Sequence, residues 1–377
     1  MRWLLFNTVG ILVYLGCCSY IGIKLYTLIC YYNQKFKQLK KIVFWIPYAV
    51  ICCLIVIYDL LLVNSHAWRT AGMVWLLSSI YLTAFFLLTD LIRLILYLLK
   101  KRIEGINAYM TAQALFLCAV LVVFGILNAR AIHTTHYDIT LKGEGERLRV
   151  ALISDMHIGT AIDESWVARY VAALNKVKPD IVCLAGDIFE RHITSNNETT
   201  EVVSLLKTIN APMGVYACFG NHDRDRMGSG SISTIWAANT LKPTDIIVLQ
   251  DEVYEVREKL FIAGRKDAQQ RSRKPADSLL AGIDGTIIVL DHQPKEFALL
   301  EQAGADLILS GHTHKGQVFP ANIAARLEYD KFGTTHYGYW KGGKTQAIVT
   351  SGVGFWGPPM RIGTRSEIAV INIHFTP

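Results

Sequence analysis

The amino-acid sequence predicts an α/β protein in two parts: a unit of four transmembrane helices over residues 1–130, then an α/β domain over residues 131–377. Long apolar runs fill the first third of the chain. In the rest, short apolar runs alternate with segments of helical spacing, which is the pattern of buried strands between amphipathic helices. The third observation is that Asp, His and Asn residues, which can take part in catalysis or bind a ligand, directly follow several of the short runs.

The overall composition fits a membrane protein better than a nucleic-acid-binding protein. Hydrophobic residues make up 52% of the 377 residues and charged residues only 18%. The formal net charge of +7 is mild for this length, so we expect membrane lipid or an anionic substrate as partner, and no nucleic acid. The eight cysteines form no CxxC motif and lie in apolar runs, so they predict no disulfide framework.

Four apolar segments are each close to the ~20 residues that cross the hydrocarbon core of a bilayer. They cover about residues 3–23, 42–63, 71–99 and 109–127. The first segment has the position of a signal peptide, but it lacks a short apolar region that ends in a small-residue cleavage site. We therefore interpret it as a retained helix.

The loops between these segments predict the orientation of the chain. Their basic residues are Lys35, Lys37, Lys40 and Lys41 in the first loop, Arg69 in the second, and Lys100, Lys101 and Arg102 in the third. Basic loops stay in the cytoplasm. We predict a multi-pass protein of the plasma or inner membrane, with an external N-terminus and an extracytoplasmic large domain. The reversed topology is the alternative.

Two charged residues, Asp90 and Arg93, fall inside the third apolar segment, one helical turn apart. One interpretation is an intramembrane pair that lines a site. The other is an interfacial pair in the last turns of a segment longer than the membrane, with Arg93 extending toward water.

The large domain begins with alternating strands and helices. Strands are predicted at 148–155 and 181–187 and in 214–223, with helices at 166–180 and 199–209 between them. The later half is richer in strands, which are predicted at 245–250, 259–264, 286–291, 306–312, 346–352 and 368–375.

Five of these strand ends carry residues that can bind a metal ion. They are Asp155 and His157, Asp187, Asn221 and His222, His292, and His312 and His314. Each motif alone has an ordinary explanation, such as a histidine pair in a loop, a helix cap or a turn. Together they favour a ligand site, because ligands bind outside the carboxyl ends of strands in α/β sheets. Oxygen and imidazole donors suit Mn, Fe or Zn.

The order of these motifs resembles the calcineurin-like metallophosphoesterase superfamily. D-x-H, G-D, G-N-H-D, a single His and G-H-x-H follow one another in that order within about residues 148–374. The stretches at 311–320 and 349–373 also resemble a subfamily of membrane-attached bacterial phosphodiesterases. The resemblance implies a central β-sandwich of two mixed sheets flanked by helices, in four layers of α/β/β/α.

By matching positions, the resemblance also implies a site for two divalent metal ions. One metal would be held by Asp155, His157 and His314, and the other by Asn221, His292 and His312, with Asp187 between them. His222 would lie over the substrate phosphate, and Asp223 would orient its ring. The chain departs from the family pattern at two positions, since Glu190 replaces a common Asp and Asp291 replaces a small or hydroxylic residue. Asp291 would orient His292 or cap the strand.

Two cations about 3.5–4 Å apart can clamp the attacking and leaving oxygens of an in-line displacement. The implied nucleophile is a hydroxide shared by the metals, because metal binding brings the pKa of water to about 7. His222 would protonate the leaving group or stabilise the phosphoryl oxygen.

Substrate contacts are predicted for Asn221, His222, Arg224 and Arg361. A basic stretch, with Arg265, Lys266, Arg271, Arg273 and Lys274, would bind an anionic group or lie solvated in a loop. Phe355 and Trp356 would shape the pocket, pack in the core or contact the membrane.

These inferences predict a membrane-anchored, metal-dependent phosphohydrolase. A phosphodiester or pyrophosphate is the expected substrate, and the anchoring favours a lipid-linked one over a soluble diester or nucleotide. The alternatives are the same hydrolase facing the cytoplasm and acting on a nucleotide or glycolipid pyrophosphate, or a non-catalytic membrane receptor or scaffold on this fold.

Overall fold

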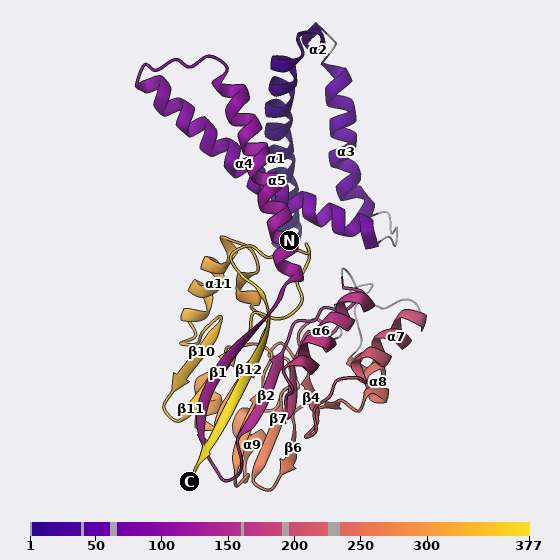
Figure 1. Cartoon of the computed structure of the whole chain (residues 1–377), viewed down its shortest axis with the longest axis vertical. Helices are drawn as coiled ribbons and strands as arrows, with labels where there is room; N and C mark the ends of the chain where they lie inside the picture. Colours follow the sequence, from indigo (N-terminus) through magenta and orange to yellow (C-terminus); the bar gives the residue numbers. More distant parts are fainter. Residues whose placement is uncertain (1, 39–40, 61–65, 160–161, 191–195, 225–233) are drawn as a thin grey trace. The chain divides into compact units, whose positions relative to one another are not determined.

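The computed structural model describes residues 2–38, 41–60, 66–159, 162–190, 196–224 and 234–377 (Figure 1). The chain divides into two compact units, Met1–Ile126 and Leu127–Pro377. The helices of the first unit are α1 (Arg2–Tyr32), α2 (Gln34–Gln38), α3 (Ile42–Leu60), α4 (His66–Leu98) and α5 (Ile106–Arg130), whose last turn reaches into the second unit.

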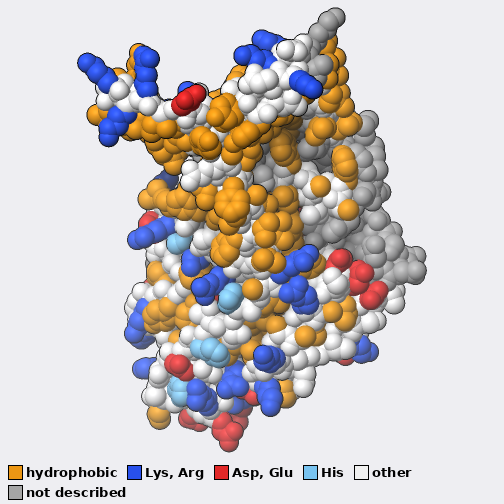
Figure 2. Space-filling view, turned by 45° about the horizontal axis from the view of Figure 1, so that its top comes forward, with side chains coloured by type: hydrophobic (Ala, Val, Ile, Leu, Met, Phe, Trp, Pro, Cys, Tyr) orange, Lys and Arg blue, Asp and Glu red, His pale blue; other side chains and the backbone are white. Residues whose placement is uncertain are grey.

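Three helices of the first unit are long and apolar enough to cross a membrane, within the described residues. They are Gly10–Tyr32, Thr70–Leu98 and Ile106–Arg130. The second of the four predicted spans, 42–63, forms helix α3 (Ile42–Leu60), and its last residues lie outside the described part of the chain. Large apolar side chains on these helices are exposed, and Figure 2 shows extensive hydrophobic surface on the molecule.

Helix α1 continues past the point where the sequence predicted the first span to end. The predicted span ends at about residue 23, and Lys24 follows it. In the structure Lys24 is neutralised, since its ammonium group forms an ion pair with Asp90 on α4. Asp90 also accepts from the Tyr20 hydroxyl at 2.5 Å and pairs with Arg93 at 2.9 Å. The predicted Asp90–Arg93 pair is therefore part of a larger cluster that joins α1 and α4.

The second unit contains two six-stranded sheets in its described part. The first sheet has the order β1-β12-β2-β3-β4-β5 and the second has the order β10-β11-β9-β8-β7-β6. The strands are β1 (Ile132–Lys142), β2 (Leu148–Ile153), β3 (Ile181–Ala185), β4 (Val215–Cys218), β5 (Ile247–Val248), β6 (Glu252–Arg257), β7 (Leu260–Gly264), β8 (Thr286–Leu290), β9 (Leu307–Ser310), β10 (Gly338–Gly342), β11 (Thr345–Val349) and β12 (Ser366–Thr376).

The strands that precede the predicted ligands run parallel to their neighbours. β2, β3 and β4 are parallel in the first sheet, and β8 and β9 are parallel in the second. Parallel neighbours bring their carboxyl ends to the same edge of a sheet, so residues far apart in sequence meet there.

A core of buried apolar residues joins the two sheets. It includes Leu152 and Cys183 of the first sheet and Ile262, Ile288 and Leu309 of the second. These strands are almost wholly apolar because both of their faces are covered. A second cluster packs helices against the first sheet, and a third packs helices against the second sheet.

The helices of this unit are α6 (Glu164–Lys176), α7 (Asn196–Leu206), α8 (Thr234–Leu241), α9 (Ala276–Leu280), α10 (Phe297–Gln302) and α11 (Ala321–Asp330), with short 3₁₀ turns at Lys242–Thr244 and His314–Gly316. Helix α6 illustrates how the sequence sets these elements. Asp163 caps its first turn by accepting from the Trp166 N–H, and Val167, Tyr170 and Leu174 recur at helical spacing on its buried face.

Each strand predicted from apolar runs has a counterpart in the structure, but three strands were missed. They are β1, β6 and β10, whose side chains are half-buried or exposed along much of their length. An edge strand with polar residues lacks the apolar pattern from which a strand is predicted. Such a strand is recognised from its pairing with a neighbouring strand in the structure.

Candidate metal centre

The carboxyl ends of five strands bring seven predicted ligands together. Asp155 and His157 follow β2, Asp187 follows β3, Asn221 follows β4, His292 follows β8, and His312 and His314 follow β9. Five of the seven have a positive φ between 48° and 68°: Asp155, His157, Asp187, His312 and His314. A non-glycine residue in this region costs on the order of 1–3 kcal/mol, and such strain concentrates at functional sites.

Glycines make room for this crowding. A Cβ atom at Gly220, just before Asn221, would collide with the Asp187 carboxylate, and one at Gly311, just before His312, would collide with Ser154. The glycines of G-N-H-D and G-H-x-H are therefore required by close packing at the sheet edge.

Asp155, His157 and His314 form one group of convergent donors. Their ligand atoms all lie within 4.8 Å of one another. The two Nε2 atoms of His157 and His314 are 3.0 Å apart, and Asp155 Oδ1 lies 3.4 Å from His314 Nε2.

Asp187, His292 and His312 form a second group with the same spacing. His292 Nε2 lies 3.1 Å from Asp187 Oδ2 and 3.2 Å from His312 Nδ1. Asp187 Oδ2 is also 3.9 Å from His157 Nε2, so this carboxylate stands between the two groups.

The Nδ1 hydrogen bonds of two histidines turn their Nε2 atoms toward the other donors. His292 Nδ1 donates to the Ala185 carbonyl at 2.8 Å, and His157 Nδ1 donates to Glu190 Oε2 at 2.5 Å. A ring whose Nδ1 holds the proton presents an unprotonated Nε2 to a metal.

These donors fit divalent cations. Asn221 Oδ1 is buried and has no hydrogen-bond partner among the described residues. Buried polar oxygens normally have a hydrogen-bond donor or another ligand. A cation would satisfy Asn221 and would also bind the imidazole nitrogens and carboxylate oxygens that lie about 3 Å apart. Nitrogen and oxygen donors without thiolate suit Mn, Fe or Zn.

Charge interactions within the site move several pKa values. Burial lowers the pKa of His292, but the Asp187 carboxylate outweighs burial and brings it to about 10. Burial lowers the pKa of His312, and His292 lowers it further, to about 3. Burial raises the pKa of Glu190, but its hydrogen bonds with His157 and His222 outweigh burial and bring it to about 2.

The carboxylate beside His222 is that of Glu190, and Asp223 was wrongly expected there. Glu190 Oε2 lies 3.0 Å from His222 Nδ1. Asp223 is fully buried and accepts from the main-chain N–H groups of Ile188, Phe189 and Gly220. Asp223 therefore ties the turn after β3 to the turn after β4. Burial and the nearby Asp187 raise the pKa of Asp223 to about 7.

Arg361 is also used differently from the sequence prediction. Its side chain is 0% exposed and donates to the carbonyls of Ser351, Gly352 and Gly354. This arginine braces a loop from inside, so the predicted substrate contact is not available to it. Arg224 is partly exposed and pairs with Asp267 at 3.6 Å.

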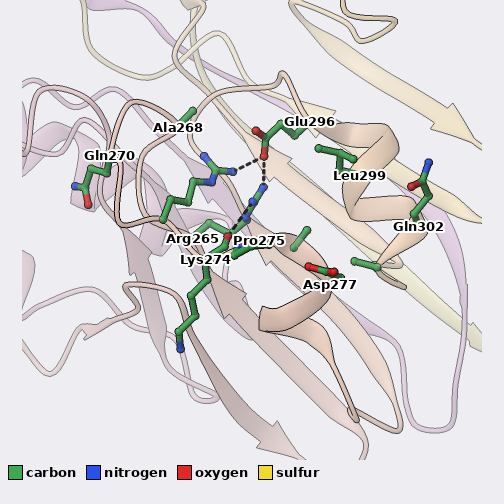
Figure 3. Close-up of a pocket in the computed structure, with 12 residues that line it drawn as sticks. Arg265, Ala268, Gln270, Lys274, Pro275, Asp277, Glu296, Leu299 and Gln302 are labelled. Atoms are coloured by element: carbon green, nitrogen blue, oxygen red, sulfur yellow. Dashed lines mark hydrogen bonds and ion pairs between the residues drawn. The ribbon is translucent and has the colours of Figure 1, made fainter.

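Asp291 does not contact the ring of His292, whose Nδ1 partner is Ala185. Its carboxylate instead pairs with Arg265 at 2.9 Å and Arg273 at 2.5 Å. Glu296 completes the quartet by pairing with the same two arginines. Arg265, Arg273 and Glu296 border a pocket of about 440 Å³, in which Figure 3 shows Arg265 and Glu296 pointing toward one another. Two of the predicted loop cations are thus held in buried ion pairs.

Comparison with known proteins gives the same identification as the motifs. Residues 148–316 match the family model for calcineurin-like phosphoesterase. The chain is 28% identical to an uncharacterized metallophosphoesterase of Campylobacter jejuni, over 75% of this chain and 76% of that protein. It is 32% identical to a transmembrane protein with metallophosphoesterase domain from Danio rerio, over 69% of this chain and 62% of that protein.

A further relative is an uncharacterized metallophosphoesterase of Bacillus subtilis, with 26% identity over 66% of this chain and 88% of that protein. The chain spans less than two thirds of the Danio rerio protein's own length. Residues 148–316 are therefore a calcineurin-like phosphoesterase domain, and the relatives of the chain are named metallophosphoesterases.

Proposed function

We propose that this protein is a membrane-anchored phosphohydrolase that cleaves a phosphodiester or pyrophosphate with two divalent cations. The observation that carries the proposal is the pair of donor groups that meet at Asp187. Asp155, His157 and His314 would hold one cation, Asn221, His292 and His312 would hold the other, and Asp187 would bridge them. Bound cations would supply a nucleophilic hydroxide at neutral pH and neutralise charge on the phosphoryl oxygens.

His222 is the proposed proton donor. Its Nδ1 is fixed by Glu190, so Nε2 is the nitrogen that exchanges a proton with the substrate. A water-derived oxygen forms a bond to phosphorus while the bond from phosphorus to the leaving oxygen breaks. The leaving oxygen then takes the proton from His222. Glu190 is a positioning residue in this scheme, since one of its oxygens contacts both His157 and His222.

The proposal extends to the architecture and topology. The domains are residues 1–130, with four transmembrane helices, and residues 131–377, in four layers of α/β/β/α. The charge bias of the loops supports an external N-terminus and an extracytoplasmic catalytic domain. A lipid-linked substrate follows from the anchoring. Alkaline phosphatase fused to the C-terminus should be active in cells, whereas fluorescence of a reporter that matures only in the cytosol would support the reversed topology.

Hydrolysis of bis-p-nitrophenyl phosphate by the purified full chain with Mn²⁺ tests the activity. We expect turnover that disappears after chelation and in Asp187→Ala. Inertness with Mn²⁺, Fe²⁺ and Zn²⁺ would instead favour the non-catalytic scaffold.

A further inference from the structure

One surface of the second unit carries a stripe of exposed apolar side chains. Phe319, Ile323 and Leu327 follow one another at intervals of four residues, and α11 begins at Ala321. Ile323 and Leu327 share a face of α11, and Phe319 lies two residues before the helix begins. Their exposed fractions are 51%, 50% and 60%. Contiguous exposed apolar side chains of this size mark a contact with a membrane or another protein.

The base of this stripe is fixed to the end of helix α5. Asn128, in the last turn of α5, donates to the main-chain carbonyls of Arg361 and Thr364, both at 2.8 Å. Between these two residues, the carbonyl of Ile362 accepts from the Phe319 N–H at 2.8 Å. Because α5 is long and apolar enough to cross a membrane, its end marks the level at which the bilayer surface begins. The stripe therefore starts at that level.

Three arginines lie near the end of helix α5. Arg130 is the last residue of α5, and its carbonyl accepts a hydrogen bond from the guanidinium of Arg169. Arg365 directly follows Thr364. All three arginines are exposed. Basic side chains next to a bilayer are attracted by anionic headgroups, at about 1 kcal/mol for each residue near the surface. The charge of this region thus suits a lipid surface better than an apolar protein partner.

Trp356 connects the stripe with the metal centre. Gln317 lies two residues before Phe319. Its side chain accepts from the Trp356 N–H at 2.9 Å and donates to the Trp356 carbonyl at 3.0 Å. The Trp356 indole is 57% exposed, and the ring centroid lies 6.4 Å from that of His222. Tryptophan favours the interface between lipid and water. A substrate held at this surface would have its phosphate close to His222.

We propose that these residues form a membrane-docking surface, made of Phe319, Ile323, Leu327, Trp356, Arg130, Arg169 and Arg365, and that its occupant is a bilayer containing anionic phospholipid. The metal centre then takes its phosphoester from a lipid in that bilayer. The second statement rests on the proposed hydrolase function, whereas the docking itself does not.

Photocrosslinking tests the docking alone. The full chain is reconstituted in vesicles of phosphatidylcholine and phosphatidylglycerol, with a diazirine amino acid at position 327. The matched control carries the same probe at Ile235, which is 72% exposed on α8, on the opposite side of the domain from α11 (Figure 1). Lipid adducts at 327 and none at 235 are expected. Equal labelling at both positions, or adducts at 327 only with a second protein chain, would overturn the proposal.

Kinetics tests the consequence for the substrate. Leu327→Asp, with Ile235→Asp as control, is assayed on soluble bis-p-nitrophenyl phosphate and on hexadecyl p-nitrophenyl phosphate embedded in vesicles. We expect Leu327→Asp to lower kcat/KM about 10-fold on the embedded probe, equivalent to ~1.4 kcal/mol, and to leave the soluble reaction unchanged. Equal rates for both variants on the embedded probe would refute the lipid substrate. If the unsubstituted chain cleaves neither probe, the hydrolase function fails, while the crosslinking result still decides the docking.

Discussion

One carboxylate oxygen, Glu190 Oε2, lies 2.5 Å from His157 Nδ1 and 3.0 Å from His222 Nδ1. It thereby couples a predicted metal ligand to the predicted proton donor. The two imidazole rings stand edge to face, with centroids 4.9 Å apart. Glu190 therefore sets the protonated nitrogen and the orientation of both rings.

Replacing Glu190 with Gln should lower kcat about 10–100-fold, as expected when the hydrogen-bond partner of a metal ligand is lost. Glu190→Asp keeps the charge and should recover part of this loss. The pH profile of kcat separates this role from a purely structural one, because Glu190→Gln removes a carboxylate that contacts two imidazole rings of the site and should change the profile. An unchanged profile with wild-type kcat would show that Glu190 positions neither ring.

His222→Ala should retain bound metal but lose turnover by about 10²–10⁴-fold, the usual contribution of a positioned acid. The loss should be smaller for a p-nitrophenyl ester than for an alkyl ester, because p-nitrophenolate needs no proton to leave. Rates on the two esters provide the test. An equal loss on both would contradict proton donation to the leaving group.

Asp291→Ala should destabilise the domain, because Arg265 and Arg273 would stay buried with one carboxylate fewer. Removing one partner of a buried ion pair typically costs about 3–5 kcal/mol. Asp138→Ala is the matched control, since Asp138 pairs with Arg147 at an exposed site and should cost under about 1 kcal/mol. Thermal unfolding in detergent compares the two, and similar melting temperatures would refute a structural role for the quartet.

Arg361→Lys should also be destabilising, although it conserves charge. A lysine cannot reproduce the planar fork that donates to several loop carbonyls at once, and each buried carbonyl left unpaired costs about 1–3 kcal/mol. We expect a lower melting temperature without a selective rise in KM. A large rise in KM at unchanged stability would restore the substrate contact that the sequence suggested.

The sequence was most informative where residues that can bind a metal ion directly follow an apolar strand. Asp155, Asp187 and His292 could be singled out because each comes at the end of a recognisable strand, and parallel strands end at a common edge. The apolar runs likewise located the strands of the two sheets, apart from edge strands such as β1.

The sequence was least informative about pairs formed between segments that are distant in the chain. Lys24 lies outside the predicted span, and its partner, Asp90, lies 66 residues away in the sequence. Glu190 looked like a departure from a motif, and Asp223 was expected to orient the His222 ring because the two residues are adjacent in sequence. Which carboxylate reaches a ring depends on how two turns pack, and no local pattern records that packing.

The metal content of the purified full chain tests the central claim most directly. Elemental analysis should find two divalent cations in each unsubstituted chain and loss of both in Asp187→Ala, since this carboxylate stands between the two donor groups. Asp138→Ala should keep both cations. Full metal content in Asp187→Ala, or a metal-free unsubstituted chain after purification with Mn²⁺, would contradict the account.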